Sequence, residues 1–247
     1  MSETWRVIEL RDLDPYDLYP MLEVMISAVG RGASPNTLFI VKATEYVVLG
    51  KKANIAKKVK IDYCKKHNIP IVRGFMTHGS SALFGRVMSY YLLLKGRTDV
   101  DILKKAVLDA LRELGLSVVH PSGANNLLFG KKKLGAIGSY YFKGTTLLSL
   151  ILFMEPSVDL AEKTLISPHD MRIYTTTVNE ALGREASIDE ISNSVRQGLQ
   201  RILGVEFEDG SLSAEEEELR EKLKEKYTSE SWIKTGRWSP VKDYGLR

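Results

Sequence analysis

Two glycine-bearing segments of the chain carry the side chains best suited to chemistry. Glycine and other small residues let backbone amides approach an anion closely, hydroxyls add hydrogen bonds, and a neighbouring ammonium supplies a point charge. This combination suits a carboxylate or phosphate ligand, although ordinary hairpin turns with solvated lysines have the same spacing. The first segment is Arg73-Gly74-Phe75-Met76-Thr77-His78-Gly79-Ser80-Ser81, and the second runs from Asn125-Asn126 through Gly130 to Lys131-Lys132-Lys133-Leu134-Gly135-Ala136-Ile137-Gly138.

Other kinds of catalytic site have little support. The histidines show no pair at metal-ligand spacing and there is no cysteine cluster, so a zinc site is not expected. Ser80 and Ser81 lack the flanking glycines of a nucleophile elbow, and no Walker or dinucleotide fingerprint is present. Cys64 falls inside an expected helix, where a buried structural thiol is the simpler interpretation.

The composition indicates an ordinary folded protein. Of 247 residues, 44% are hydrophobic and 27% charged, which excludes disordered and fibrous classes. The single Cys64 excludes a disulfide scaffold and favours a reducing, cytoplasmic setting. Met1–Arg11 is interrupted by charges and the apolar run Leu147–Met154 is too short to span a bilayer, so we expect no membrane partner. We expect no nucleic-acid partner either, because the net charge of +4 is mild and the cluster Lys51–Lys66 lacks interleaved aromatics.

The hydrophobic period predicts the elements that position the two segments. Strands are expected at 37–42 and 45–49, paired with each other, and a helix over 57–68 leads into a strand at 69–73. The aromatic and aliphatic run 87–94 predicts a buried strand on the far side of the first glycine-bearing segment.

The second half of the chain changes from hairpins to helices. Asp99 is the predicted N-cap of a helix that ends near Gly115, and glycines punctuate a set of hairpins over 116–154. Capping-box spacing at 187–190 and 213–216 begins two later helices. A mixed sheet flanked by helices fits this order best.

The order of these features is more specific than any one of them. A strand ending at Val72-Arg73 is followed by a small-residue loop, an aromatic strand, a helix, the Asn125-Asn126 pair and the glycine-rich stretch 130–138. This order resembles that of the lipoate-protein ligase family, which shares its fold with biotin-protein ligases. Shorter fragments extend the likeness over almost the whole chain, namely 47–50, 61–64, 69–73, 144–148, and 225–229 with Trp232.

The resemblance implies a fold and a domain organisation. The fold would be α/β (α+β), with a mixed, largely antiparallel sheet flanked by helices. The length is similar to that of the archaeal type of ligase, whose catalytic domain works with a separate small accessory subunit. We therefore expect residues 1–247 to form a single catalytic domain, with residues 187–247 as a helical C-terminal portion.

The resemblance also implies a two-step reaction. Lipoate and ATP, with Mg²⁺, form an enzyme-bound lipoyl adenylate, and a lysine of an acceptor domain then attacks it. The acceptor would be an acyltransferase subunit of a 2-oxoacid dehydrogenase or a glycine-cleavage H-type protein. The family's essential lysine corresponds to Lys133, with Lys132 a less favoured neighbour. Residues implied in substrate and nucleotide binding are Arg73, Thr77, His78, Gly79, Ser80, Ser81, Asn125, Asn126, Gly135 and Ala136, and Mg²⁺ would lie near Asn126.

The chain departs from the family pattern at three places. Family members carry an Arg-Arg pair and three glycines where this chain has Arg73-Gly74 and Gly79. Asn126 stands where the family has Asp, and Lys143 where it has His. These changes leave two alternatives open. One is an octanoyl or lipoyl transferase that works without ATP, and the other is a non-catalytic paralogue that binds an acyl or lipoylated partner.

Overall fold

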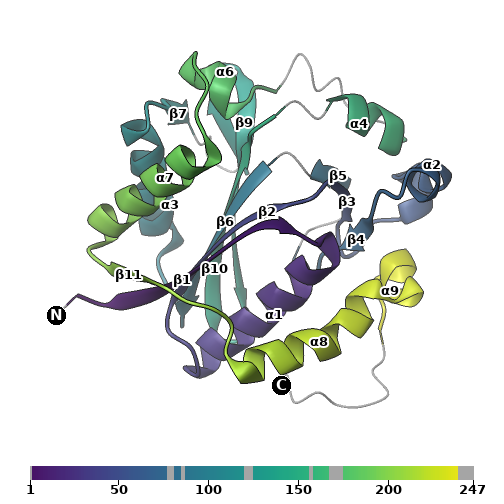
Figure 1. The fold of residues 1–247 in the computed structure, drawn as a ribbon, viewed down its shortest axis with the longest axis horizontal. Helices are drawn as coiled ribbons and strands as arrows, with labels where there is room; N and C mark the ends of the chain where they lie inside the picture. The colour runs from purple at the N-terminus through teal and green to yellow at the C-terminus, as the bar shows by residue number, and fades with distance from the viewer. Residues whose placement is uncertain are drawn as a thin grey trace.

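The molecule is organised around one large sheet with helices on both faces (Figure 1). The structure, a computed structural model, describes residues 2–76, 81–84, 87–119, 125–155, 158–166 and 175–238. Within these residues the large sheet has eight strands, in the order β11 (Glu206–Asp209), β1 (Thr4–Leu13), β2 (Thr37–Ala43), β6 (Val87–Lys95), β10 (Thr145–Phe153), β9 (Lys132–Phe142), β8 (Asn126–Phe129) and β7 (Val118–Val119).

Most neighbouring strands of this sheet run antiparallel. The parallel pairs are β11 with β1 and β1 with β2. From β2 onward every pair is antiparallel, through β6, β10, β9 and β8 to β7. The predicted mixed, largely antiparallel sheet flanked by helices is therefore confirmed, and the hairpins expected over 116–154 are β7 to β10.

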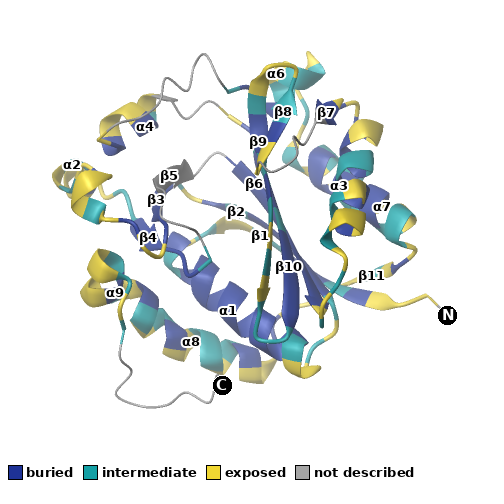
Figure 2. Cartoon of the chain, turned by 180° about the vertical axis from the view of Figure 1, so that it is seen from behind, coloured by how far each residue is buried: buried dark blue, intermediate teal, exposed yellow. Residues whose placement is uncertain are grey.

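Helix α1 (Pro15–Arg31) lies against one face of the large sheet, and α8 (Ala214–Thr228) packs on the outer side of α1 (Figure 2). Asp14 begins α1, because its carboxylate accepts a hydrogen bond from the Tyr16 amide at 3.0 Å and Pro15 takes the first helical position. No element was expected before Thr37, so β1 and α1 were missed. A helix buried on two sides lacks the single apolar stripe that reveals a surface helix.

Helices α3 (Val100–Glu113) and α7 (Ile188–Leu203) pack together on the opposite face of the large sheet. Asp99 caps α3, its side chain accepting from the Asp101 amide at 2.9 Å. Gly115 follows that helix with a φ of +100°, which favours glycine. The helix predicted between Asp99 and Gly115 is confirmed. Ser187 likewise begins α7, accepting from the Glu190 amide at 3.1 Å.

A second sheet, of three strands in the described residues, has the order β4 (Ile71–Arg73), β3 (Tyr46–Leu49) and β5 (Ser81–Phe84). The expected pairing of 37–42 with 45–49 is wrong, because β2 joins the large sheet and β3 the small one. Both strands are buried along most of their length, so their apolar runs give no sign of which neighbour they pair with. The helix expected over 57–68 is shorter and consists of a 3-10 turn, η1 (Ile55–Lys57), and α2 (Ile61–Lys66).

The later part of the chain is largely but not wholly helical. After α4 (Val158–Thr164) come α6 (Val178–Leu182), α7, then β11 at the edge of the large sheet, and finally α8 and α9 (Glu230–Thr235). Ser213 and Glu216 form the predicted capping box of α8, each accepting a hydrogen bond from the other's amide. Among the helices of the described segments, none combines the length and the apolar character needed to cross a bilayer.

A buried charge network fastens α8 to α1. The Glu23 carboxylate of α1 lies 2.7 Å from the Lys226 ammonium and 3.5 Å from that of Lys143, and it accepts a hydrogen bond from the Tyr227 hydroxyl at 2.7 Å. Burial, the largest single influence, opposes the negative charge, but Lys226, the Tyr227 hydroxyl and Lys143 together outweigh it and lower the pKa of Glu23. Loss of Glu23 would leave the Lys226 ammonium without its carboxylate partner, so the network helps to fix the C-terminal helices in place.

Candidate active site

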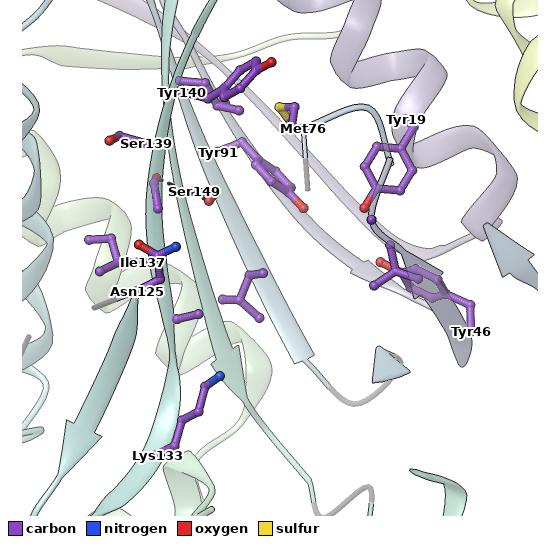
Figure 3. Close-up of a pocket in the computed structure, with 16 residues that line it drawn as sticks. Tyr19, Tyr46, Met76, Tyr91, Asn125, Lys133, Ile137, Ser139, Tyr140 and Ser149 are labelled. Carbon is purple, nitrogen blue, oxygen red and sulfur yellow. Dashed lines mark hydrogen bonds between the residues drawn. The ribbon is translucent and has the colours of Figure 1, made fainter. Parts of the chain in front are cut away.

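A cavity of about 430 Å³ lies between the large sheet, α1 and the small sheet (Figure 3). This volume is in the range of small-molecule sites. The wall is mainly apolar and aromatic, and among the described residues its charged member is Lys133. The lining residues are Tyr19, Tyr46, Val48, Gly50, Met76, Tyr91, Asn125, Lys133, Ala136, Ile137, Gly138, Ser139, Tyr140, Leu147, Ser149 and Ile151.

A bulge in β9 directs Lys133 into this cavity. Leu127 of β8 pairs with Gly135, whereas the next residue, Leu128, pairs with Lys133, so Leu134 is an extra residue on β9. In regular pleating, Lys133 and Ala136 would point to opposite faces of the sheet because they are three positions apart. The bulge instead lets both reach the cavity, while Leu134 is buried in the core beneath α3 and α7.

The Lys133 ammonium is half-buried and lacks a compensating charge. Within the described residues it has no hydrogen bond or ion pair, and its Nζ lies 5.8 Å from the centroid of the Phe153 ring. Burial lowers the pKa of Lys133 below its ordinary value. Lys132, the less favoured candidate, is exposed and absent from the cavity wall. A desolvated ammonium without a partner is costly, so an anion bound at this wall would be stabilised by Lys133.

Arg73 has a different environment from the one expected. Its side chain is fully buried at 0% exposure, and it does not line the cavity. The guanidinium donates only to backbone carbonyls in the described residues, at distances from 2.7 to 3.1 Å, and burial lowers its pKa. The acceptors are the carbonyls of Gly50, Lys51, Ala53, Ile233 and Lys234.

These bonds place the Arg73 side chain among backbone carbonyls and off the cavity wall, so its expected contact with the ligand stays a prediction. They tie β4 to the loop after β3 and to the end of α9, and the Trp232 indole closes the connection by donating to the Arg73 carbonyl at 2.9 Å. We call this group, made of Arg73, Trp232 and the carbonyls that Arg73 binds, the arginine clasp. The clasp helps to shape the cavity, because Arg73 binds the carbonyl of Gly50 and Gly50 lines the cavity wall.

The residues expected around Lys133 divide into two groups. Asn125 and Ala136 line the cavity, and the Asn125 carbonyl accepts from the Ile137 amide at 2.9 Å. Asn126 is exposed on β8 and outside the wall. Gly135 is also outside the wall, and a Cβ there would meet the Ile151 carbonyl oxygen at 2.0 Å. The close approach of β9 and β10 therefore accounts for a glycine here, and its contact with a ligand stays a prediction.

Part of the predicted first segment cannot be placed. Thr77, His78, Gly79 and Ser80 lie outside the described residues. Ser81 begins β5, where it pairs with Leu49, and its side chain is not described.

The Mg²⁺ expected near Asn126 has no protein ligand set in the part of the chain that is described. No group of three or more His, Cys, Asp or Glu side chains converges there. Mg²⁺ in nucleotide sites is commonly held by one or two carboxylates together with substrate phosphates, and Asn126 offers an amide on an exposed strand. The described residues do not fit a resident Mg²⁺ site, and we assign no step to it.

Three tyrosines of the wall were missed by sequence reasoning. Tyr19, Tyr46 and Tyr91 come from α1, β3 and β6, which are far apart in the sequence. Aromatic residues in buried elements are indistinguishable from ordinary core residues until the tertiary structure shows which of them face a cavity.

Gly74 is explained by one of these tyrosines. A Cβ at position 74 would lie 2.7 Å from the hydroxyl oxygen of Tyr19 and equally close to its ring. A side chain at position 74 and the Tyr19 ring therefore exclude each other. This exclusion accounts for the glycine that follows Arg73 in this chain.

The sequence matches a known family model. The model is described as the lipoyl protein ligase A/B catalytic domain, and the match covers residues 14–200. Lipoate-protein ligase A subunit 1 of Thermoplasma acidophilum is 25% identical over an alignment 210 positions long, which covers 75% of this chain and 79% of the relative. Octanoyltransferase LipM of Moorella thermoacetica is 23% identical over an alignment 273 positions long, gaps included, which covers 94% of this chain and 98% of the relative.

Two solved structures have the same fold. One, from a study of the bi-partite lipoate protein ligase of T. acidophilum and its E2 lipoyl domain, has a TM-score of 0.79 and 21% identity and covers 98% of this chain and 99% of its own. The other is a lipoate-protein ligase A bound with ATP, with a TM-score of 0.77, 20% identity, and coverage of 94% of this chain and 98% of its own.

Proposed function

We propose that this chain, which belongs to the lipoyl protein ligase A/B catalytic domain family, is a lipoate-protein ligase that activates lipoate with ATP. The observation that carries the proposal is the Lys133 ammonium, which is partly desolvated, lacks a counter-ion among the described residues and lies on the wall of a largely apolar cavity. An apolar wall accepts an aliphatic acid, and the ammonium binds its carboxylate.

The first step brings two anions together. A carboxylate oxygen of lipoate attacks the α-phosphorus of ATP, the bond from that phosphorus to the β-phosphate oxygen breaks, and pyrophosphate leaves. Lys133 would lie between the carboxylate and the α-phosphate, relieve their repulsion and stabilise the charge that develops in the transition state.

The second step transfers the acyl group. The neutral amine of an acceptor lysine attacks the carbonyl carbon of the lipoyl adenylate, AMP leaves, and the amine loses a proton to give an amide. We propose an acceptor of the acyltransferase-subunit or glycine-cleavage H type, a separate accessory subunit and a cytoplasmic setting. The similar T. acidophilum protein supports the first two, since it is named subunit 1 and its bi-partite ligase was studied with an E2 lipoyl domain.

A second candidate function is octanoyl transfer without ATP, favoured by the similarity to octanoyltransferase LipM along nearly the whole chain. A thiol-dependent transfer finds no support at the cavity. Cys64 is the chain's single cysteine, it is fully buried in the cluster around the small sheet, and burial raises the pKa of its thiol.

One experiment separates the two functions. The purified chain, with and without a candidate accessory subunit, would be incubated either with lipoate and ATP or with an octanoylated carrier protein and no nucleotide. Lipoyl adenylate detected by mass spectrometry, with equimolar pyrophosphate, is the expected result. Acyl transfer from the carrier alone would establish the transferase, and ligand binding without either product would indicate a non-catalytic paralogue.

A further inference from the structure

Three tyrosine hydroxyls converge on one part of the cavity. Tyr19, Tyr46 and Tyr91 are 6%, 3% and 6% exposed, so the little surface that each retains faces the cavity it lines. In Figure 3 their hydroxyls point toward a common space, whereas Lys133 approaches from β9 and ends apart from them. We call these three residues the tyrosine cluster. The cavity therefore has a cationic part and a hydroxyl-rich part.

Within the cluster, the hydroxyl of Tyr19 is the one best able to bond a ligand. Its ring packs against Phe75 and Tyr227, with centroid distances of 6.1 and 6.0 Å. The hydroxyl itself has no hydrogen-bond partner within the described residues. Because this hydroxyl faces the cavity, a ligand atom that accepts its proton would add a hydrogen bond there, worth about 0.5–1.5 kcal/mol.

All three hydroxyls keep their protons near neutral pH. Burial raises the pKa of Tyr91 to about 12, although its hydrogen bond with Ser89 acts in the opposite direction. Burial raises the pKa of Tyr19 and of Tyr46 well above the ordinary value. The cluster therefore offers neutral O–H groups and the edges and faces of three aromatic rings.

We propose that the tyrosine cluster receives the end of the acid opposite its carboxylate and selects acids with an accepting or polarisable atom there. This inference rests on the proposed function, which places the carboxylate at Lys133. The ring sulfurs of lipoate satisfy both features of the cluster, because sulfur is a weak acceptor and makes favourable contacts with aromatic rings. The methyl end of octanoate would leave the Tyr19 hydroxyl unpartnered, and a site built to bond a polar group discriminates against an analogue that lacks it.

The test is equilibrium binding measured by calorimetry, which does not require catalysis. The probes are lipoate, octanoate and 8-hydroxyoctanoate, the last of which adds one terminal hydroxyl to the octanoate chain. We expect the unmodified chain to bind lipoate and 8-hydroxyoctanoate more tightly than octanoate. In Tyr19→Phe, which keeps the ring, this preference should shrink by roughly threefold to tenfold, the range expected for one hydrogen bond between neutral groups. Octanoate affinity should stay the same or rise.

Tyr141→Phe is the matched control. Tyr141 lies on β9 with 43% of its surface exposed, outside the cavity wall and beneath the Arg97 guanidinium, so the same chemical change there should leave all three affinities unaltered. Equal affinity for lipoate and octanoate, or a preference unchanged in Tyr19→Phe, would overturn the inference. Preserved selectivity without adenylate formation would instead contradict the ligase function and leave the cluster's role intact.

Discussion

The sequence predicted that Lys133 and Arg73 belong to one site, but the structure gives the two cations opposite environments. The Arg73 guanidinium is completely buried, and backbone carbonyls from two other segments accept its hydrogen bonds. The Lys133 ammonium is less buried, yet among the described residues it has neither a hydrogen bond nor a salt bridge. The difference shows that the satisfaction of a buried cation, more than its burial, distinguishes a structural group from one that awaits a ligand.

The two regions also differ in their relation to the family match. Lys133 lies within residues 14–200, whereas the part of the arginine clasp contributed by α9 lies beyond them. The clasp nevertheless bears on the cavity, since it holds the backbone at Gly50. The C-terminal helices are thus part of the structure that shapes the site.

The largest effect is expected from breaking the arginine clasp. Arg73→Met keeps much of the side-chain volume but leaves buried carbonyls without donors, so the free energy of unfolding should fall by on the order of 3 kcal/mol or more. Urea denaturation would measure the change. Arg237→Met, at an exposed arginine near the same helix, should shift stability by less than about 0.5 kcal/mol. Equal stabilities of the two variants would refute the structural role of Arg73.

Removing the Lys133 ammonium should lower activity strongly and stability little, the reverse of the effect expected at Arg73. We expect Lys133→Ala to lower the rate of adenylate formation by about a hundredfold or more, because the charge that offsets two reacting anions is lost. Its free energy of unfolding should change by less than about 1 kcal/mol, since no bond to a described group is broken. Lys132→Ala, at the exposed neighbour, is the control and should keep its rate of pyrophosphate release. A normal rate in Lys133→Ala would rule out this assignment.

The packing of the clasp can be isolated by comparing two glycines. Gly236 and Gly183 have nearly the same φ, +68° and +67°, so an alanine carries similar backbone strain at either position. A Cβ at Gly236 would lie 2.3 Å from the Lys51 carbonyl oxygen, whereas nothing lies within 4 Å at Gly183. We expect Gly236→Ala to cost about 1–2 kcal/mol more than Gly183→Ala in thermal or urea unfolding. Equal costs would mean that the backbone around Lys51 can shift to accommodate the new Cβ without a loss of stability.

The smallest effect is a pH dependence that belongs to Lys133 alone. Burial lowers its pKa from the ordinary 10.5, so its ammonium loses the proton at a lower pH than a solvated lysine does. The charged form is the active one, and adenylate formation should therefore decline as pH rises through this lowered pKa. Lys133→Arg keeps its charge and should lose the decline while turning over more slowly. An identical alkaline decline in both proteins would assign it to another group.

The sequence predicted the fold best where local signals were strong. Three predicted helix ends are found: the N-cap at Asp99, the glycine that follows the helix at Gly115, and the capping box that begins at Ser213. Each depends only on residues close together in the chain. The pairing of β2 and β3 was wrong, because two apolar strands buried along their length can satisfy their ladders in either sheet. β1 and α1 were missed for a related reason, as α1 is covered by the sheet and by α8.

The candidate site was predicted less completely than the fold. The lysine triplet located the cationic wall, but only the bulge at Leu134 explains why Lys133, and not Lys132, faces the cavity. A bulge arises from the register of two strands and cannot be read from one of them. The tyrosine cluster left no local signal, since its members come from three distant elements.

The sequence by itself determined the family, the mixed sheet and the presence of a lysine beside small residues in a hairpin. The tertiary structure alone decided which cation is satisfied and which is not. Arg73 meets the carbonyl of Ile233 across 160 positions of chain, and such a long-range bond exists only once the sheets and helices have packed. Local patterns fix elements because neighbouring residues share a helix or strand, whereas the partners of a buried charge are set by the packing of segments that are distant in sequence.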